Sequence, residues 1–340
     1  MGARAEGAQT PLRNTLPLFQ PFRRAREEPG LSRTRALLFL TGEPMQLEGR
    51  TAIITGAGGG LGRQHALYLA RKGARVVVND LGLDAAEAVA AEIRAAGGTA
   101  IAAAASVTDE AAVAAMVQRT LQAWGRIDIL VNNAGILRDR SFAKMELDGF
   151  REVLDVHVMG AAVCCKAVWE QMRAQARGRI VLTTSSSGLW GNFGQANYGA
   201  AKMALVGLMQ TLAIEGRKYD IRVNCLAPTA STGMTAGVLP EESLRVLEPA
   251  LVSPALLPLV IDDAPTRAIV CAGGGHFARA FVTLTQGRHL GGGEDAGERL
   301  VEAWDAVSDP SGQLVPEYGF TQAEREVASA QAQARSAEPA

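Results

Sequence analysis

The sequence has no excess of charge of either sign. Its 340 residues contain 34 lysines and arginines and 35 aspartates and glutamates, which leaves a formal net charge of −1. Binding to nucleic acid needs a basic excess, so we do not expect nucleic acid as a partner. Long apolar runs are also missing. The run Leu37–Leu40 is far shorter than the roughly 18 residues of a membrane span, so we expect no membrane association.

Cysteine and histidine are scarce and scattered. The four cysteines form no CxxC pair, and Cys164 and Cys165 are adjacent, which is poor geometry for a mutual disulfide. We interpret the cysteines as small buried hydrophobic side chains in a reducing compartment, and we expect a cytoplasmic protein. The four histidines show no metal-ligand spacing, so no metal site is predicted.

Residues 1–45 differ in composition from the rest of the chain. They contain seven arginines and no lysine, and no sustained period runs through them. We interpret them as a disordered or non-native extension, translated from a start upstream of Met45. An organellar transit peptide, which the glutamates of this segment fit poorly, and a partner-binding arm are the alternatives. A folded domain over residues 46–290 and a C-terminal extension over residues 291–340 are expected to follow.

From Arg50 onward, short apolar segments alternate with segments of helical period. This alternation predicts an α/β fold in which one doubly wound, Rossmann-type parallel sheet carries helices on both faces. The predicted strands are 51–55, 75–79, 100–104, 127–132, 179–184, 222–225 and 268–271. The predicted helices are 61–72, 84–96, 108–124, 149–175 and 197–219.

A glycine-rich segment, TGAGGGLG at 55–62, lies between the first predicted strand and the first predicted helix. Glycines let the backbone turn tightly and approach a pyrophosphate, whose charge then faces the amides of the helix N-terminus. The spacing is Gly56-xxx-Gly60-x-Gly62 and not GxGxxG, because Leu61 stands at the last glycine of that motif. The segment predicts a cofactor-binding turn, and a plain glycine turn is the alternative.

An acidic residue, Asp80, ends the second predicted strand, 18 positions after Gly62. A carboxylate at this place can accept hydrogen bonds from both ribose hydroxyls and would repel a 2′-phosphate. No arginine follows directly to neutralise such a phosphate. The residue therefore favours NAD over NADP as cofactor, and a loop-capping aspartate is the alternative.

Tyr198 and Lys202 are four residues apart on a predicted helix and therefore share a face. A lysine ammonium beside a phenol is expected to lower the phenol pKa from about 10. The phenol can then move a proton at a substrate oxygen while hydride moves at carbon. Ser185 follows a predicted strand and can hydrogen-bond the same oxygen. A surface tyrosine and a solvated lysine are the alternative, which the serine and the upstream glycine turn disfavour.

Together these residues resemble the short-chain dehydrogenase/reductase family. The resemblance covers roughly residues 46–290 and rests on TGAGGGLG at 55–62, NNAG at 132–135, Ser185, YGAAK at 198–202, Asn224 and Pro228. It implies a dinucleotide-binding catalytic domain with Tyr198 as the acid/base. It assigns NAD binding to Gly56, Gly60, Leu61, Gly62, Asp80, Ser106, Val107, Asn133, Tyr198, Lys202 and Thr232, and catalysis to Ser185, Tyr198, Lys202 and His157.

Two positions depart from the family pattern. His157 stands where the wider family has a catalytic asparagine, whose backbone carbonyl holds a water that reaches the lysine. A backbone role survives the substitution, and a satisfied helical histidine is the alternative. Ser106 and Val107 stand where many relatives have Asp-Val beside the adenine. The serine hydroxyl can still bind the adenine amino group, although more weakly.

A narrower resemblance concerns VVVNDLG at 76–82, NNAGILRDRSF at 132–142 and GNFGQANY at 191–198. These segments are similar to (3R)-hydroxyacyl-CoA dehydrogenases, which occur as one part of peroxisomal multifunctional enzymes of type 2 and as stand-alone bacterial proteins. The resemblance implies NAD-dependent oxidation of a (3R)-3-hydroxyacyl-CoA to the 3-oxoacyl-CoA. A reductase of 3-oxoacyl carrier protein or of a steroid ketone is the first alternative, and a non-catalytic nucleotide-sensing regulator is the second.

The predicted helices at 149–175 and 197–219 carry apolar residues beyond those that the sheet requires. These are Ala161, Val163, Ala167, Val168, Ala204, Leu208 and Leu212. Burial in the chain's own core is one interpretation. A helix-pair interface in a homodimer or homotetramer is the other, and the family resemblance favours it. The substrate loop at 231–252 has no fixed signature, so acyl-chain length cannot be predicted.

Overall fold

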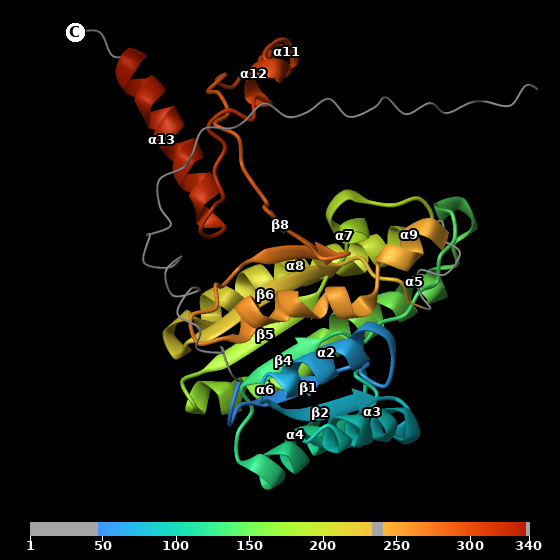
Figure 1. Ribbon diagram of the computed structural model, residues 1–340. Coiled ribbons are helices and arrows are strands. Elements are labelled where there is room, and N and C mark those ends of the chain that lie inside the picture. The colour runs from blue at the N-terminus through green and yellow to red at the C-terminus, as the bar shows by residue number, and fades with distance from the viewer. Residues whose placement is uncertain (1–46, 233–240, 338–340) are drawn as a thin grey trace, which may run out of the picture. The chain divides into compact units, whose positions relative to one another are not determined.

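The structure is a computed structural model that describes residues 47–232 and 241–337. The predicted N-terminal extension and part of the substrate loop lie outside the described residues. Within the described residues, one sheet has the strand order β3-β2-β1-β4-β5-β6-β7-β8 (Figure 1). The strands are β1 Thr51–Ile54, β2 Arg75–Asp80, β3 Thr99–Ala104, β4 Ile129–Asn132, β5 Gly178–Thr183, β6 Ile221–Pro228, β7 Ile269–Gly273 and β8 His276–Ala280.

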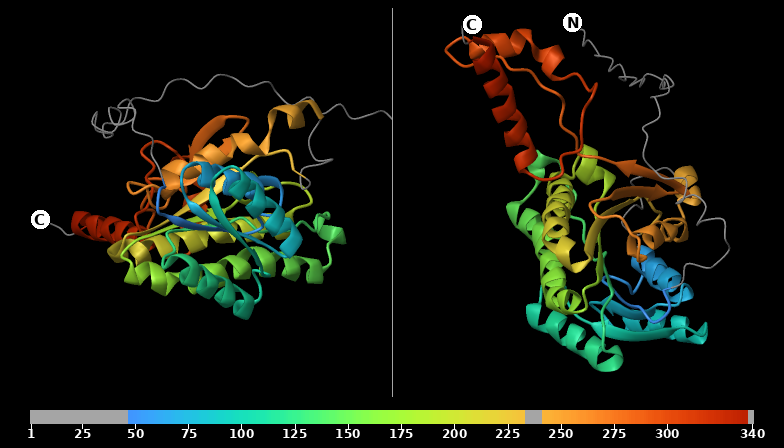
Figure 2. Two further views of the ribbon diagram at one scale, coloured as in Figure 1. Left: turned by 60° about the horizontal axis from the view of Figure 1, so that its bottom comes forward. Right: turned by 90° about the vertical axis from the view of Figure 1, so that its left-hand side faces the viewer.

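Successive residues of β1 show why helices cover both faces of the sheet. Ala52 and Ile54 pack into one core cluster, whereas Ile53 packs into the other. The first cluster includes residues of α2 (Gly60–Arg71), α3 (Leu83–Ala95) and α10 (Leu257–Val260). The second includes residues of α4 (Glu110–Trp124), α6 (Gly160–Ala174) and α8 (Ala196–Gly216). Figure 2 shows the sheet edge-on between these two layers in its right-hand view.

The strand order places a binding crevice at the carboxyl ends of the central strands β1 and β4. The pairs β1–β2, β2–β3, β1–β4, β4–β5, β5–β6 and β6–β7 are all parallel. The chain moves outward from β1 to β3 and then returns to pair β4 with β1. In such a sheet, ligands bind beyond the carboxyl ends of the strands at the point where the order reverses. This confirms the predicted Rossmann-type α/β fold.

The eighth strand was not predicted, and it is antiparallel to β7. The sequence pattern predicts 268–271 as the last strand of the sheet. In the structure Gly274 and Gly275 have φ values of +57° and +77° and form a two-residue turn between β7 and β8. Two consecutive left-handed residues make the tight turn of a hairpin, and two glycines adopt it without strain. Most side chains of β8 are exposed, so its sequence carried no core pattern.

The helix predicted at 149–175 is interrupted in the structure. It consists of α5 (Leu147–Leu154), a π-helical turn at Asp155–Met159 and α6. The remaining helices are α7 Ser186–Trp190, α9 Glu241–Val246, α11 Ala296–Glu302, α12 Trp304–Val307 and α13 Phe320–Ala337. No helix among the described residues is long and apolar enough to cross a membrane.

Candidate active site

A cavity of about 620 Å³ lies at the carboxyl ends of the parallel strands. Its walls come from the turn after β1, the ends of β2, β3 and β4, the π-helical turn, α7, α8 and the segment after β6. Every residue that the sequence assigned to the site lines this cavity: Gly56, Gly60, Leu61, Gly62, Asp80, Ser106, Val107, Asn133, His157, Ser185, Tyr198, Lys202 and Thr232. The fold therefore brings together residues from distant parts of the chain.

The glycine turn shows why the backbone, and not side chains, forms this wall. A Cβ atom on Gly62 would lie 2.1 Å from the carbonyl oxygen of Gly56. Gly56 itself has a φ of +60°, and a Cβ there would lie 2.8 Å from Cα of Ala134. Space beside Gly59 is open, and no side chain caps the N-terminus of α2. The first amides of α2 are therefore suited to an anionic group such as a pyrophosphate.

Asp80 joins the end of β2 to the glycine turn. Its Oδ2 accepts a hydrogen bond of 2.8 Å from the amide of Gly58, and its Oδ1 accepts one of 2.8 Å from the amide of Leu81. The carboxylate thus caps the local loop, as one interpretation of the sequence held. A carboxylate has about four acceptor positions, so each oxygen can still accept a bond from a ribose hydroxyl.

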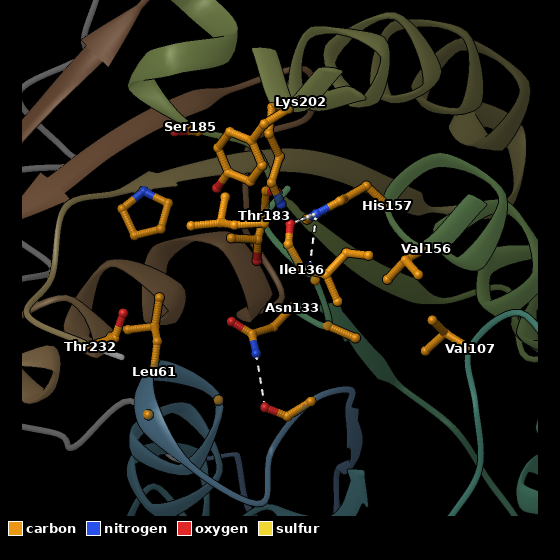
Figure 3. Close-up of a pocket in the computed structure, with 18 of the residues that line it drawn as sticks. Leu61, Val107, Asn133, Ile136, Val156, His157, Thr183, Ser185, Lys202 and Thr232 are labelled. Carbon is orange, nitrogen blue, oxygen red and sulfur yellow. Dashed lines mark hydrogen bonds between the residues drawn. The ribbon is translucent and has the colours of Figure 1, made fainter. Parts of the chain in front are cut away.

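The side chain of Asn133 faces the glycine turn. Its Nδ2 donates to the carbonyl oxygens of Thr55 and Gly56 at 3.0 and 3.1 Å, and Figure 3 draws one of these bonds as a dashed line. The hydroxyl oxygen of Thr55 accepts from the amides of Asn133 and Ala134 at 3.0 and 3.1 Å. These bonds tie the end of β4 to the turn after β1. Asn133 therefore acts on the shape of the turn, and Thr55 is its partner that the sequence did not single out.

The residues expected near an adenine have different surroundings. The hydroxyl of Ser106 is 2.8 Å from that of Thr108, so it is already engaged locally. Val107 is buried, and a Cβ on Gly160 would lie 2.6 Å from its Cγ2. Gly160 begins α6, so this close approach fixes α6 against the loop after β3. Val107 thereby connects the cavity wall to the core.

Lys202 is buried on α8 and is held by the last residue of β5. Its Nζ donates a 2.6 Å hydrogen bond to the carbonyl oxygen of Thr183 and lies 5.5 Å from the ring centroid of Tyr198. A Cβ on Gly188 of α7 would lie 2.7 Å from Cβ of Lys202, so α7 and α8 pack closely at this point. Figure 3 shows Lys202, Thr183 and Ser185 at the same end of the cavity.

Burial governs the titration of the tyrosine and lysine. It raises the pKa of Tyr198, whose hydrogen bond with Ser185 acts in the opposite direction. Burial also lowers the pKa of Lys202 to about 7. The sequence predicted a phenol pKa below its ordinary value, whereas the net direction in the structure is upward because burial prevails. The physical reason is that a buried pair loses the hydration of both charged forms.

His157 lies in the π-helical turn, and only 2% of its surface is exposed. Its Nε2 is 3.0 Å from the amide nitrogen of Ile136 and 2.8 Å from the carbonyl oxygen of the same residue. The ring packs edge-on against Tyr198 with 5.3 Å between centroids. Burial, followed by the charge of Lys202, lowers the pKa of His157 to about 3. The imidazole is therefore neutral at physiological pH.

Some cavity residues were missed by the sequence reasoning. They are Asn79, Leu81, Ile136, Leu137, Val156, Thr183, Ser187, Asn192, Gln195 and Thr229 among others. Most of them act through backbone atoms or lie in loops without a regular period, so no pattern indicated them. Gln195 had one available signal, because it stands three residues before Tyr198 on the same segment. The described residues contain no group of His, Cys, Asp or Glu that could hold a metal ion.

Comparison with known proteins identifies the family of this site. The family model for short chain dehydrogenases matches residues 50–243. A short-chain type dehydrogenase/reductase of Mycobacterium tuberculosis is 42% identical over 78% of this chain and 96% of its own length. Peroxisomal multifunctional enzyme type 2 of Mus musculus is 48% identical over 63% of this chain but only 30% of its own length. A 3-oxoacyl-[acyl-carrier-protein] reductase of Synechocystis is 42% identical over 59% of this chain and 82% of its own length.

Solved structures agree with this assignment. A short chain dehydrogenase from Mycobacterium avium has a TM-score of 0.69 and 37% identity, and the match covers 80% of this chain and 99% of that one. A 7α-hydroxysteroid dehydrogenase complexed with NADH and 7-oxo glycochenodeoxycholic acid has a TM-score of 0.64 and 31% identity, with 68% and 96% covered. The chain is therefore an oxidoreductase that belongs to the short-chain dehydrogenase/reductase family.

Proposed function

We propose that the protein is an NAD-dependent dehydrogenase that oxidises (3R)-3-hydroxyacyl-CoA to 3-oxoacyl-CoA, with Tyr198 as the acid/base. One observation carries the proposal. Ser185, Tyr198 and Lys202 line the same cavity as the glycine turn and Asp80. A proton-transfer group and a dinucleotide cradle thus share one space, which is what oxidation of a secondary alcohol requires.

The residues of the cradle fit a dinucleotide. The uncapped N-terminus of α2 and the open space beside Gly59 suit a pyrophosphate. Asp80 can accept from the hydroxyls of the adenosine ribose, and its negative charge would repel a 2′-phosphate, which supports NAD over NADP. When bound, NAD supplies the hydride acceptor. Leu61 and Thr232 line the same wall, where they can enclose the bound group.

The three catalytic residues have different roles in moving the substrate proton. In its phenolate form, the Tyr198 oxygen takes the proton of the substrate hydroxyl while hydride leaves the carbon that bears this hydroxyl. The Ser185 hydroxyl hydrogen-bonds the substrate oxygen and holds it beside the phenol. Lys202, with a pKa of about 7, is protonated in part of the molecules at neutral pH, and its charged form favours the phenolate. Thr183 and Ile136 hold Lys202 and His157 through backbone atoms.

The substrate class is supported by the resemblance in sequence and by the relatives. The segments similar to (3R)-hydroxyacyl-CoA dehydrogenases support a 3-hydroxyacyl thioester, and the similarity to peroxisomal multifunctional enzyme type 2 agrees with that resemblance. Similarity to a 3-oxoacyl-[acyl-carrier-protein] reductase supports the reverse reaction on a carrier-bound acyl group as the second candidate. The intact set of Ser185, Tyr198 and Lys202 argues against a nucleotide sensor without activity, because a sensor needs no proton relay.

Steady-state kinetics test the proposed function. We expect NAD reduction with (3R)-3-hydroxybutyryl-CoA and longer (3R) thioesters, no turnover of the (3S) thioesters, and at least about 100-fold higher kcat/KM with NAD than with NADP. A preference for NADPH together with faster reduction of a 3-oxoacyl carrier protein would replace the proposal with the second candidate. Rapid turnover of a steroid alcohol but not of any acyl thioester would also contradict it.

The role of Asp80 has its own test. Asp80→Asn removes the charge that repels a 2′-phosphate, so we expect the ratio of kcat/KM for NAD over NADP to fall by about 10- to 100-fold. The matched control is Asp84→Asn, because Asp84 is an exposed aspartate in the first turn of α3. That variant should keep the wild-type cofactor ratio. An unchanged ratio in Asp80→Asn would remove Asp80 from the cofactor site.

A further inference from the structure

A hydrogen-bonded network around one buried glutamine lies at the cavity wall and has no role in the mechanism above. Its centre is the side chain of Gln195, which is only 8% exposed and lines the cavity. The amide oxygen of Gln195 accepts from the Ser187 hydroxyl at 2.8 Å and from the Asn192 amide at 3.2 Å. Its Nε2 donates a 2.7 Å bond to Oδ2 of Asp139. The network thus ends on a carboxylate.

Chemistry determines the orientation of the Gln195 amide. A carboxylate oxygen can only accept, so the atom that faces Asp139 must be the amide nitrogen. The amide oxygen then faces two donors, which is the only arrangement that satisfies all partners. Without the Asp139 carboxylate, the Gln195 amide would lose the partner that accepts a hydrogen bond from its nitrogen and cannot donate one to its oxygen.

The backbone around Asp139 is fixed independently of its side chain. The amide of Arg140 donates a 2.9 Å bond to the carbonyl oxygen of Gly194. Nδ2 of Asn197, which is fully buried, donates a 3.0 Å bond to the carbonyl oxygen of Arg138. The loop after β4 is therefore joined to the start of α8 on both sides of Asp139. Replacing the carboxylate by an amide should leave this backbone in place.

We propose that Asp139 is a positioning residue of the active site, which holds the Gln195 amide in one orientation on the cavity wall and whose negative charge acts on Tyr198. The proposal rests on the proposed function in one respect, namely that Tyr198 is the acid/base. No described residue donates to Oδ1 of Asp139, although this oxygen is shielded from solvent. Oδ2 of Asp139 thus orients the Gln195 amide, whereas Oδ1 accepts no hydrogen bond from the described residues.

The charge of Asp139 acts on the phenol together with its other neighbours. It raises the pKa of Tyr198, in the same direction as burial, whereas the hydrogen bond with Ser185 lowers it. Lys202 faces Tyr198 from the same helix α8, and the His157 ring faces it from the π-helical turn. Cys225 of β6 lies beside Lys202 and is buried and protonated, since burial raises its pKa to about 12. Asp139 therefore adds to the effect of burial, which favours the protonated phenol.

An ultraviolet difference titration tests the electrostatic part without any substrate. The spectrum of each protein is compared with that of its own Tyr198→Phe version, so that only Tyr198 contributes. Asp139→Asn should lower the pKa of Tyr198 by about 0.5 to 1 unit. Asp148→Asn is the matched control, because Asp148 is an exposed aspartate on α5 whose side chain pairs with Arg151. It should leave the pKa unchanged, and an equal shift in both variants, or none in Asp139→Asn, would overturn the proposal.

A charge exchange tests the positioning part. Gln195→Glu places two carboxylates where the present contact is 2.7 Å, so we expect kcat/KM to fall at least about tenfold. The double variant Asp139→Asn/Gln195→Glu restores one amide and one carboxylate and should recover activity to within about threefold of Asp139→Asn alone. A double variant as impaired as Gln195→Glu would contradict the proposal. If the wild-type protein oxidises no hydroxyacyl-CoA, the proposed function fails, whereas the titration still decides on Asp139.

Discussion

Single residues of the glycine turn set how closely the chain can approach a cofactor. The turn leaves no room at Gly62, where an added Cβ would lie 2.1 Å from a carbonyl oxygen of the same turn. It leaves open space at Gly59, whose φ of −167° any residue can adopt. Gly59 and Gly62 are three positions apart, but only Gly62 must be glycine for lack of space, and substitution can separate the two cases.

We expect Gly62→Ala to lose about 2 to 4 kcal/mol of unfolding free energy and most of its NADH affinity, because the turn must move to admit the methyl group. Gly59→Ala is the control, and its unfolding free energy should lie within about 1 kcal/mol of the wild-type value. Urea unfolding and NADH fluorescence titration measure the two effects. Equal stability of the two variants would show that the turn is not packed as described.

Tyr198 offers the second test at this scale. Tyr198→Phe removes only the hydroxyl, so the variant should fold and still bind NADH, while kcat/KM falls by about 10³-fold or more, at the upper end for loss of a general acid/base. Tyr68→Phe on α2 removes a hydroxyl outside the cavity and should keep full activity. The measurement is steady-state turnover with NADH binding as the folding check. Near-normal turnover of Tyr198→Phe would refute the mechanism.

At the level of elements, the π-helical turn between α5 and α6 determines where His157 points. An uninterrupted helix over 149–175, as predicted, would carry its side chains in a regular 3.6-residue period. The π turn at Asp155–Met159 widens the backbone by one residue and brings His157 to the cavity, against the backbone of Ile136. Such turns recur at functional sites. Gly135, in the loop after β4, also contacts this ring closely, because a Cβ at Gly135 would lie 2.2 Å from the imidazole.

The packing of α2 against the segment before α10 involves a second buried histidine. Nδ1 of His65 is 2.9 Å from the Ser253 hydroxyl, and both residues are buried. Burial lowers the pKa of His65 to about 3. Between pH 6.5 and about 3, His65 is therefore protonated in the unfolded chain but neutral in the folded chain. Stability must fall as the pH drops through that window and is unaffected by His65 above it.

We expect His65→Gln to flatten the pH dependence of the unfolding free energy by about 2 kcal/mol between pH 7 and pH 5. The ion pair of Asp262 with Arg177 does not contribute to the slope between pH 5 and pH 7, because the hydrogen bond from Arg177 lowers the pKa of Asp262 below its ordinary acidic value. His276→Gln on β8 is the control, because His276 is exposed whereas His65 is buried. Denaturant unfolding at the two pH values is the measurement. A wild-type slope in His65→Gln would contradict the burial argument.

At the scale of the whole molecule, the predicted apolar helix faces are only partly used within the chain. Ala161 and Val168 are buried in the chain's own core, as one interpretation of the sequence held. Met159, Met203 and Ile214 are 53%, 40% and 41% exposed next to or on α6 and α8. Exposed apolar side chains on neighbouring helices favour association with a second copy.

We therefore expect sedimentation equilibrium at micromolar concentration to give a multiple of the 35.7 kDa chain mass. The double variant Met203→Arg/Ile214→Arg places two charges on this face and should sediment as a single chain. Ala114→Arg on the exposed side of α4 introduces the same charge elsewhere and should leave the mass unchanged. A wild type of 35.7 kDa would contradict the expected homo-oligomer.

Local pattern by itself determined the fold class, the glycine turn and the spacing of Tyr198 and Lys202, because these features depend on neighbours within a few positions. The β7–β8 hairpin, the π turn and the bonds of Lys202 and His157 to backbone atoms were decided only by the tertiary structure. The same holds for the pairing of Asp139 with Gln195, 56 positions apart. The pKa of Tyr198 makes the reason plain: a spacing of four residues brings an ammonium near a phenol, but burial depends on the whole fold, and here burial prevails.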